Sequence, residues 1–200
     1  MRRLIIIDGG TAASGDGDIA RGGWAKSLRG AILDKNPTKE RTMRHTVDIL
    51  ADRGRTIVDV AKDLRQSSHR KGSLVTLVMA VGVDDAYIRP QGSVSEPRFA
   101  AGLQDIANFV SEQETKLVVV GPQPTIYKTG AEQQRAALYA AHLAEIATAT
   151  IGMEFVDTAA IFSPYPDYQV MDSANMSPNA LGHELLFHAV KRSLEDNGTL

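Results

Sequence analysis

Acidic side chains follow two apolar, strand-like runs of this chain. Asp8 comes directly after the run 4–7, and Asp84 and Asp85 come just after the run 74–81. Because the carboxyl ends of parallel strands meet at one edge of a sheet, these carboxylates are expected to share a cleft. Such a cluster can accept hydrogen bonds from a cationic or polyhydroxylated ligand, coordinate a divalent cation, or act as a general acid or base. The alternative is that the aspartates only cap their own loops.

The elements that must position these residues alternate regularly along the chain. Buried-type strands are predicted at 4–7, 45–51, 74–81, 117–120 and 153–156. Helices are predicted at about 19–33, from 57, from 99, at about 131–150 and at about 179–194, and 161–177 is expected to be irregular. This alternation predicts an α/β, three-layer α/β/α architecture, in which helices cover both faces of a doubly wound, five-stranded parallel sheet of the flavodoxin-like type.

Length and composition limit the possible functions. Two hundred residues with 43% hydrophobic content predict a single domain, 1–200, with one substantial core. The net charge of −2, with dispersed basic residues, argues against a nucleic acid or a membrane surface as partner. The lack of cysteine excludes disulfides and thiolate chemistry. The first apolar run is too short for a signal peptide or membrane span, so a cytoplasmic location is expected.

Four short segments carry the motif evidence. They are IDGGTA at 7–12, RGRT at 53–56, GVDD at 82–85 and ANMSPNALGH at 174–183. In their order and approximate spacing they resemble the four motif blocks of the SGNH, or GDSL-type, hydrolases, a family of esterases, lipases and thioesterases. The match spans nearly the whole chain. The resemblance implies the same three-layer fold and a cleft formed by these four segments.

The same resemblance implies where a catalytic triad would lie, and the chain departs from it there. In the family the first-block serine is the nucleophile, the last-block histidine is its base, and an aspartate three residues earlier orients that base. The corresponding positions here are Gly10, Ser177 and Ala174. None of these residues can perform those roles. The chain is therefore predicted not to be a conventional esterase.

The oxyanion-binding positions implied by the resemblance are changed unevenly. Gly54 still offers its backbone amide, whereas Asp84 replaces an asparagine whose side chain would donate. An ionised carboxylate only accepts hydrogen bonds, and it would oppose a developing oxyanion. The predicted oxyanion or ligand-binding set is therefore Gly10, Gly54, Asp84 and Ser177, with Asp8 and Asp84 as the carboxylates available for altered chemistry.

Three residues lie near the positions of the missing catalytic side chains and could replace them. Ser14, four residues after Gly10, could serve as a nucleophile, and Thr11 lies even closer. Serine and threonine in a glycine-rich loop more often bond to their own backbone, and this is the preferred interpretation. His183 follows Ser177 in the last helix, where the preferred interpretation is a packing or surface residue.

A second resemblance concerns the first segment alone. Its DGGT also looks like the phosphate-binding turn of sugar kinases and actin-like proteins, in which backbone amides cradle nucleotide phosphates. That family needs two large lobes, and this chain has little room for them. No Walker-type phosphate-binding motif occurs either. This interpretation therefore ranks below the hydrolase resemblance.

The functional hypothesis is a small-molecule ligand or protein partner bound in the old catalytic cleft. The alternatives are a repurposed enzyme that uses Asp8 and Asp84 on a small polar substrate, and an esterase or acylhydrolase that uses Ser14. No cofactor and no resident metal are predicted, and a homo-oligomer remains open.

Overall fold

A computed structural model describes the chain over residues 2–8, 23–34, 45–51, 54–66, 74–86, 93–122, 129–172 and 177–200. The side chains of Asp8, His45, Ala51, Leu74 and Tyr168 are also outside the described part. Among these residues no helix is long and apolar enough to cross a membrane.

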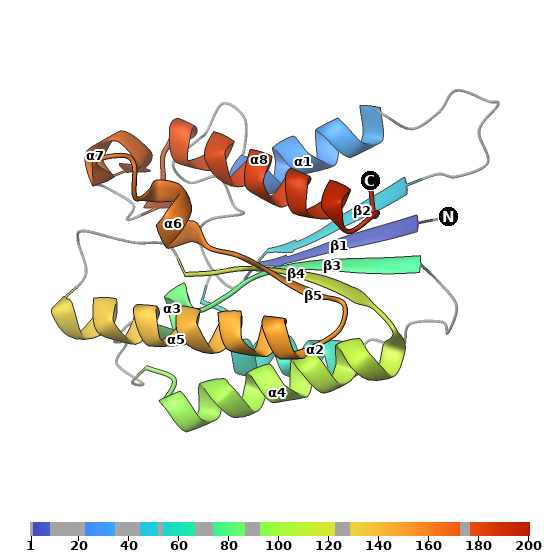
Figure 1. Cartoon of the computed structure of the whole chain (residues 1–200), viewed down its shortest axis with the longest axis horizontal. Helices are drawn as coiled ribbons and strands as arrows, with labels where there is room; N and C mark the ends of the chain where they lie inside the picture. Colours follow the sequence, from blue (N-terminus) through green and yellow to red (C-terminus); the bar gives the residue numbers. More distant parts are fainter. Residues whose placement is uncertain are drawn as a thin grey trace.

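The centre of the fold is a five-stranded sheet in the order β2-β1-β3-β4-β5 (Figure 1). Its strands are β1 (Arg2–Asp8), β2 (His45–Ala51), β3 (Leu74–Ala80), β4 (Lys116–Val120) and β5 (Met153–Val156). All neighbouring strands pair in parallel. This order changes direction between β1 and β3, which is the switch point where open α/β sheets bind ligands. The predicted doubly wound, five-stranded parallel sheet is confirmed.

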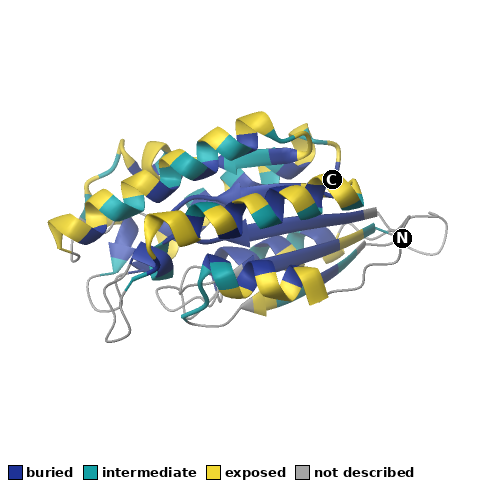
Figure 2. Ribbon diagram, turned by 90° about the horizontal axis from the view of Figure 1, so that it is seen from below, coloured by how far each residue is buried: buried dark blue, intermediate teal, exposed yellow. Residues whose placement is uncertain are grey.

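Helices form a layer on each face of the sheet (Figure 1). One layer holds α1 (Gly23–Asp34), α6 (Thr158–Phe162), α7 (Asp167–Val170) and α8 (Ala180–Asp196), and the other holds α2 (Ile57–Gln66), α3 (Val83–Ala86), α4 (Glu96–Gln113) and α5 (Gly130–Ala149). In Figure 2 the strands are buried, while the helices expose their outer faces. The predicted three-layer architecture is therefore confirmed.

The apolar run of β1 supplies both halves of the core. Ile5 and Ile7 pack in the cluster under α2, α4 and α5, whereas Leu4 and Ile6 pack in the cluster under α1 and α8. Because successive side chains of a strand point to opposite faces, a central strand must be apolar at every position. This is why a continuous β-branched run predicted the strand correctly.

Helical spacing predicted the buried stripes equally well. The predicted stripe of α2 is buried at Ile57, Val60, Ala61 and Leu64. The predicted stripe of α4, which begins at Phe99, is buried as well. The first helix was expected to begin near 19, but residues 19–22 lie outside the described part.

The segment expected to be irregular contains short regular elements. Beyond α6 and α7, it forms β6 (Met171–Asp172), which pairs antiparallel with β7 (Ser177–Pro178). Elements of two to five residues are too short to leave a periodic signal in the sequence. They nonetheless place Ser177 directly before the last helix.

The start of α8 is fixed tightly against the preceding segment. The Asn179 side chain accepts a hydrogen bond from the Gly182 amide at 3.1 Å and donates to the Gln169 carbonyl at 2.9 Å. A Cβ on Gly182 would lie only 2.2 Å from the Val170 carbonyl oxygen. The helix can approach the backbone of α7 this closely only because residue 182 has no side chain.

We predict that Gly182→Ala destabilises the protein by about 3 kcal/mol or more, because a backbone oxygen must move to admit the methyl group. Urea unfolding measures this free energy. The matched control is Gly30→Ala in α1, where the added Cβ meets nothing within 4 Å. That variant should gain about 0.5 to 1 kcal/mol from its better helix propensity. Equal stabilities of the two variants would contradict the prediction.

Candidate functional site

The carboxyl ends of three strands lie level at the switch point of the sheet. Asp8 at the end of β1 pairs with Ala51 of β2 on one side and with Ala80 of β3 on the other. The loops that follow these strands contain the first three motif segments. The side chain of Asp8 lies outside the described part, as do all of Gly10, Ser14 and Ala174, so the predictions for these residues stay predictions.

The second segment makes a tight turn into α2. Gly54 has φ of +83°, a conformation that disfavours any residue with a side chain. Two residues later, the Thr56 amide and hydroxyl donate to the Asp59 carboxylate at 2.9 and 2.7 Å. Partial burial works to raise the pKa of Asp59, but the bonds from Thr56 and the charge of Arg55 together hold it below its usual range. This is a helix cap that holds the loop at its exit.

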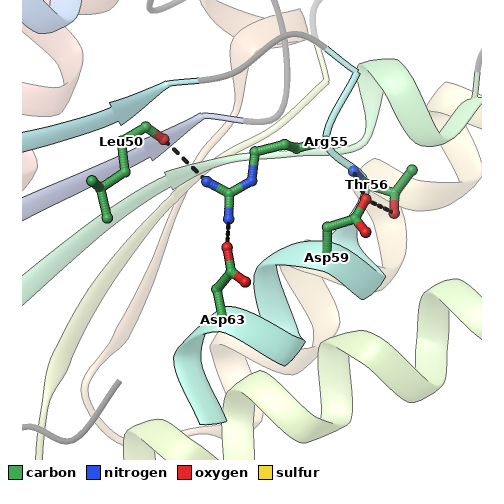
Figure 3. Close-up of polar contacts among 5 residues, drawn as sticks. All are labelled: Leu50, Arg55, Thr56, Asp59 and Asp63. Carbon is green, nitrogen blue, oxygen red and sulfur yellow. Dashed lines mark hydrogen bonds and ion pairs between the residues drawn. The ribbon is translucent and has the colours of Figure 1, made fainter. Parts of the chain in front are cut away.

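Arg55 fixes the same loop from its other side (Figure 3). Its guanidinium donates to the Leu50 carbonyl of β2 at 3.5 Å and pairs with Asp63, nearly two turns into α2. The side chain is only 15% exposed, although it lies in a loop. Arg55 thus joins the end of β2 to α2 across the turn that presents Gly54. The sequence did not reveal this role of Arg55. It also left the cap at the start of α2 unpredicted, although the Thr56–Asp59 spacing is a recognisable cap signature.

The third segment contains a fully buried carboxylate. Asp85 accepts hydrogen bonds from the Ile57 amide at 2.9 Å and from the Gly82 amide at 3.1 Å. The first bond satisfies a free amide at the start of α2, and the second closes the turn after β3. Asp85 therefore joins the third motif segment to Ile57, the residue that directly follows the second segment. The geometry of Asp85 therefore agrees with the interpretation that the aspartates cap loops by accepting backbone amides.

Asp84 lies beside it at the start of α3 and is half-buried. Gly82, two residues earlier, has φ of +102°, and a Cβ there would lie 3.2 Å from the Pro122 ring. The turn after β3 therefore requires glycine for both its backbone and its space. Asp84 is therefore carried by a turn that Asp85 ties to the start of α2.

Helix α3 is also anchored from the α5 side. The Arg135 guanidinium donates to the Ala86 carbonyl at 2.9 Å, and the Val94 amide donates to the Asp85 carbonyl at 3.1 Å. The Tyr139 hydroxyl donates to the Val94 carbonyl in turn. Together these three hydrogen bonds constrain the turn that carries Asp84.

The fourth segment places Ser177 in the interior. Its side chain is fully buried in β7, and its hydroxyl has no hydrogen-bond partner among the described residues. His183, one turn into α8, is buried as well, and its Nδ1 accepts a hydrogen bond from the Trp24 amide at 3.3 Å. His183 therefore packs α8 against the start of α1, in agreement with the packing interpretation.

No group of three histidine, aspartate or glutamate side chains that could hold a metal ion occurs within the described ranges. This edge contains instead the two glycine turns at Gly54 and Gly82 and the half-buried Asp84. The structure joins the third segment to the residue after the second directly through Asp85. It places Ser177 in the helical layer with α1 and α8, on the other face of the sheet.

Comparison with known proteins adds evidence on the fold. No family model matches the sequence, and neither does any curated protein. Solved structures do match. A lipase/acylhydrolase from Enterococcus faecalis is 18% identical with a TM-score of 0.74, and the alignment covers 98% of this chain and 97% of that one. The acetylxylan esterase Axe2 from Geobacillus stearothermophilus is 15% identical with a TM-score of 0.72, over 95% and 92% of the chains. LAE5, an alpha/beta hydrolase enzyme from the Lake Arreo metagenome, is 16% identical with a TM-score of 0.73, over 94% and 92%.

These alignments run along almost the whole of each chain. The chain has an SGNH-hydrolase fold. At this identity the similarity establishes architecture and leaves the chemistry to the site residues. The matched Axe2 structures include catalytic mutants in which a serine, an aspartate or a histidine is replaced by alanine. The architecture that the sequence resemblance implied is therefore confirmed.

The buried Asp85 generates a prediction about pH. Burial raises the pKa of Asp85 to about 6, although the amides of Ile57 and Gly82 act in the opposite direction. In the unfolded chain an aspartate titrates near pH 3.9. The folded state therefore binds more protons between about pH 4 and pH 6, and the contribution of Asp85 to stability falls as pH rises through that window. Two pKa units set an upper bound of about 3 kcal/mol.

The measurement is urea unfolding of wild type and Asp85→Asn from pH 4 to pH 7. The stability advantage of wild type over the variant should shrink as pH rises. Asp59→Asn is the matched control of opposite sign, because the lowered pKa of Asp59 gives stability that is lost as pH falls. An advantage over Asp85→Asn that grows with pH would contradict the prediction.

Proposed function

We propose that this protein binds a small polar ligand in the cleft where hydrolases of this fold cleave esters, and that it does not hydrolyse conventional esters. The observation that carries the proposal is the identity and the burial of residue 177. In register with the last motif block, the position of the catalytic base is occupied by a buried serine. A serine hydroxyl is not basic near neutral pH, so it cannot take a proton from a nucleophile.

The local structure supports this register. In the motif a proline and an asparagine follow the base and a helix begins, and here Pro178 and Asn179 lie directly before α8. Asn179 caps the helix and Gly182 makes its close approach to Val170, so these residues keep structural roles. If the motif were aligned even one residue earlier or later, its asparagine would no longer coincide with the cap residue Asn179. The replacement of the base by Ser177 is therefore best explained as a real substitution within a preserved motif.

The oxyanion side of the cleft supports the same conclusion. Gly54 retains a backbone amide in a turn braced by Arg55, but Asp84 replaces the side-chain donor of the motif. A carboxylate near a developing oxyanion raises the barrier to acyl transfer. By contrast, the oxygens of an ionised carboxylate are well suited to accept hydrogen bonds from a ligand that carries donor groups or a positive charge. The proposed ligand is accordingly cationic or polyhydroxylated.

We predict that the wild-type protein does not turn over 4-nitrophenyl acetate above the rate of a heat-denatured sample. A saturable steady-state rate would contradict the proposal. If Ser14→Ala then abolished that rate, the alternative esterase that uses Ser14 would be correct.

The same assay tests the register by reconstruction. The quadruple variant Gly10→Ser, Asp84→Asn, Ala174→Asp, Ser177→His should acquire ester hydrolysis, because it restores nucleophile, oxyanion donor, orienting acid and base together. The matched control carries Gly10→Ala with the same three other substitutions, and it should stay inactive. A circular dichroism spectrum equal to that of wild type establishes that each variant is folded.

Ligand binding is tested with two probes of different chemistry. Xylotriose represents polyhydroxylated ligands, since Axe2 is an acetylxylan esterase, and putrescine represents cationic ones. We predict that one of them saturably shifts the amide resonances of Gly54 and Gly82. Asp84→Asn should weaken that binding about tenfold or more, because a charged hydrogen bond contributes roughly 1.5 to 3 kcal/mol.

Asp196→Asn, at the exposed end of α8, removes the same charge far along the chain and is the control. Binding that Asp84→Asn leaves unchanged would place the ligand elsewhere and contradict the proposal. Catalytic conversion of a bound probe that is lost in Asp84→Asn would instead establish the repurposed enzyme.

A further inference from the structure

A groove runs along the outer surface between α2 and α4. Its volume is about 390 Å³, within the range typical of small-molecule sites. Val58 and Ala61 of α2 and Ala101 and Gly102 of α4 form its apolar floor. None of these residues belongs to the four motif segments, so the groove is not explained by the cleft at the strand ends.

The hollow arises from small side chains on two helices that pack closely. A Cβ on Gly102 would lie 3.2 Å from Cγ2 of Ile57, so the two helices approach each other at this point. Beside the contact, Ala61 and Ala101 project only methyl groups. A larger side chain at position 61 or 101 would fill the groove. The longer side chains of Lys62, Arg65 and Arg98 border it.

The rim of the groove carries excess positive charge. Lys62, Arg65 and Arg98 line it together with a single carboxylate, that of Asp105. Arg65 and Asp105 pair with each other across the groove. Lys62 and Arg98 make no hydrogen bond or ion pair within the described part of the chain, and both are exposed.

The charge of Lys62 helps to lower the pKa of Asp59, but neither Lys62 nor Arg98 forms an ion pair among the described residues, and both lie above an apolar floor. Asp59, the nearest carboxylate before Lys62 on α2, already accepts two hydrogen bonds from Thr56. Lys62 lines the groove from α2, and Arg98 lines it from α4, one helical turn before Gly102. An anionic group placed between them would meet both charges while its apolar remainder covered the alanines.

We propose that this groove binds an amphipathic organic anion, a carboxylate carried on an apolar chain of moderate length. The carboxylate bonds to Lys62 and Arg98 as charge-assisted hydrogen bonds, and the chain lies on Val58, Ala61 and Ala101. Because the cations are exposed, the attraction is screened by salt, and affinity falls as ionic strength rises. The site is independent of the function proposed for the cleft.

Octanoate is the probe, and octylammonium, of equal chain length and opposite charge, is its control. Octanoate should saturably shift the methyl resonances of Val58, Ala61 and Ala101 in NMR titrations at low ionic strength, whereas octylammonium should not. The double variant Lys62→Gln, Arg98→Gln should raise the dissociation constant at least tenfold. The matched variant Lys26→Gln, Arg29→Gln removes the same charge from exposed positions of α1 and should leave the constant unchanged.

Ala101→Phe provides a second, charge-neutral test, because the ring fills the groove and should abolish the shifts at Val58 and Ala61. Ala137→Phe, at an exposed position of α5, is its control. Three results would each overturn the proposal. They are the absence of saturable octanoate shifts, equal binding of octylammonium, and an equal loss of affinity in the Lys26 and Arg29 control.

Discussion

The bond pair made by Asp85 is the constraint on which the rest of this edge depends. One buried carboxylate accepts the amide of Ile57 at the start of α2 and the amide of Gly82 after β3. Without it two loops would each hold an unsatisfied buried donor, and nothing else among the described bonds would join them so directly. The bracing by Arg55 and Thr56 on one loop, and by Arg135 and Tyr139 on the other, acts on a geometry that Asp85 sets.

This constraint does not depend on the residues at the predicted triad positions. The glycine turns at 54 and 82 are held by backbone bonds and by Asp85, and none of these contacts requires a nucleophile or a base. In the last segment, the helix cap of Asn179 and the close contact of Gly182 are likewise independent of residue 177. These contacts therefore fix the framework of this edge whatever residue occupies position 177.

The layers of the fold were predictable because each has a strong local cause. A β-branched run such as Leu4–Ile7 must be buried on both faces, and the spacing of Ile57, Val60 and Leu64 puts an apolar stripe on one side of a helix. The short elements between Ile161 and Ser177 were not predictable, since two to five residues hold no period. Gly182 appeared as a motif residue in the sequence, but only its distance from the Val170 carbonyl reveals why a side chain is excluded.

For the candidate site, the sequence by itself determined which residue types are present: Gly10, Ala174 and Ser177 at the positions that the resemblance predicts for a triad, and no cysteine or Walker-type motif. Tertiary structure alone decided what the aspartates do. Asp84 and Asp85 are adjacent and chemically identical, yet one is half-buried at the cleft edge and the other is buried between two backbone amides. The physical reason is that one partner of Asp85, the Ile57 amide, belongs to α2, twenty-eight residues earlier in the chain, and only folding brings that amide within 2.9 Å of the carboxylate.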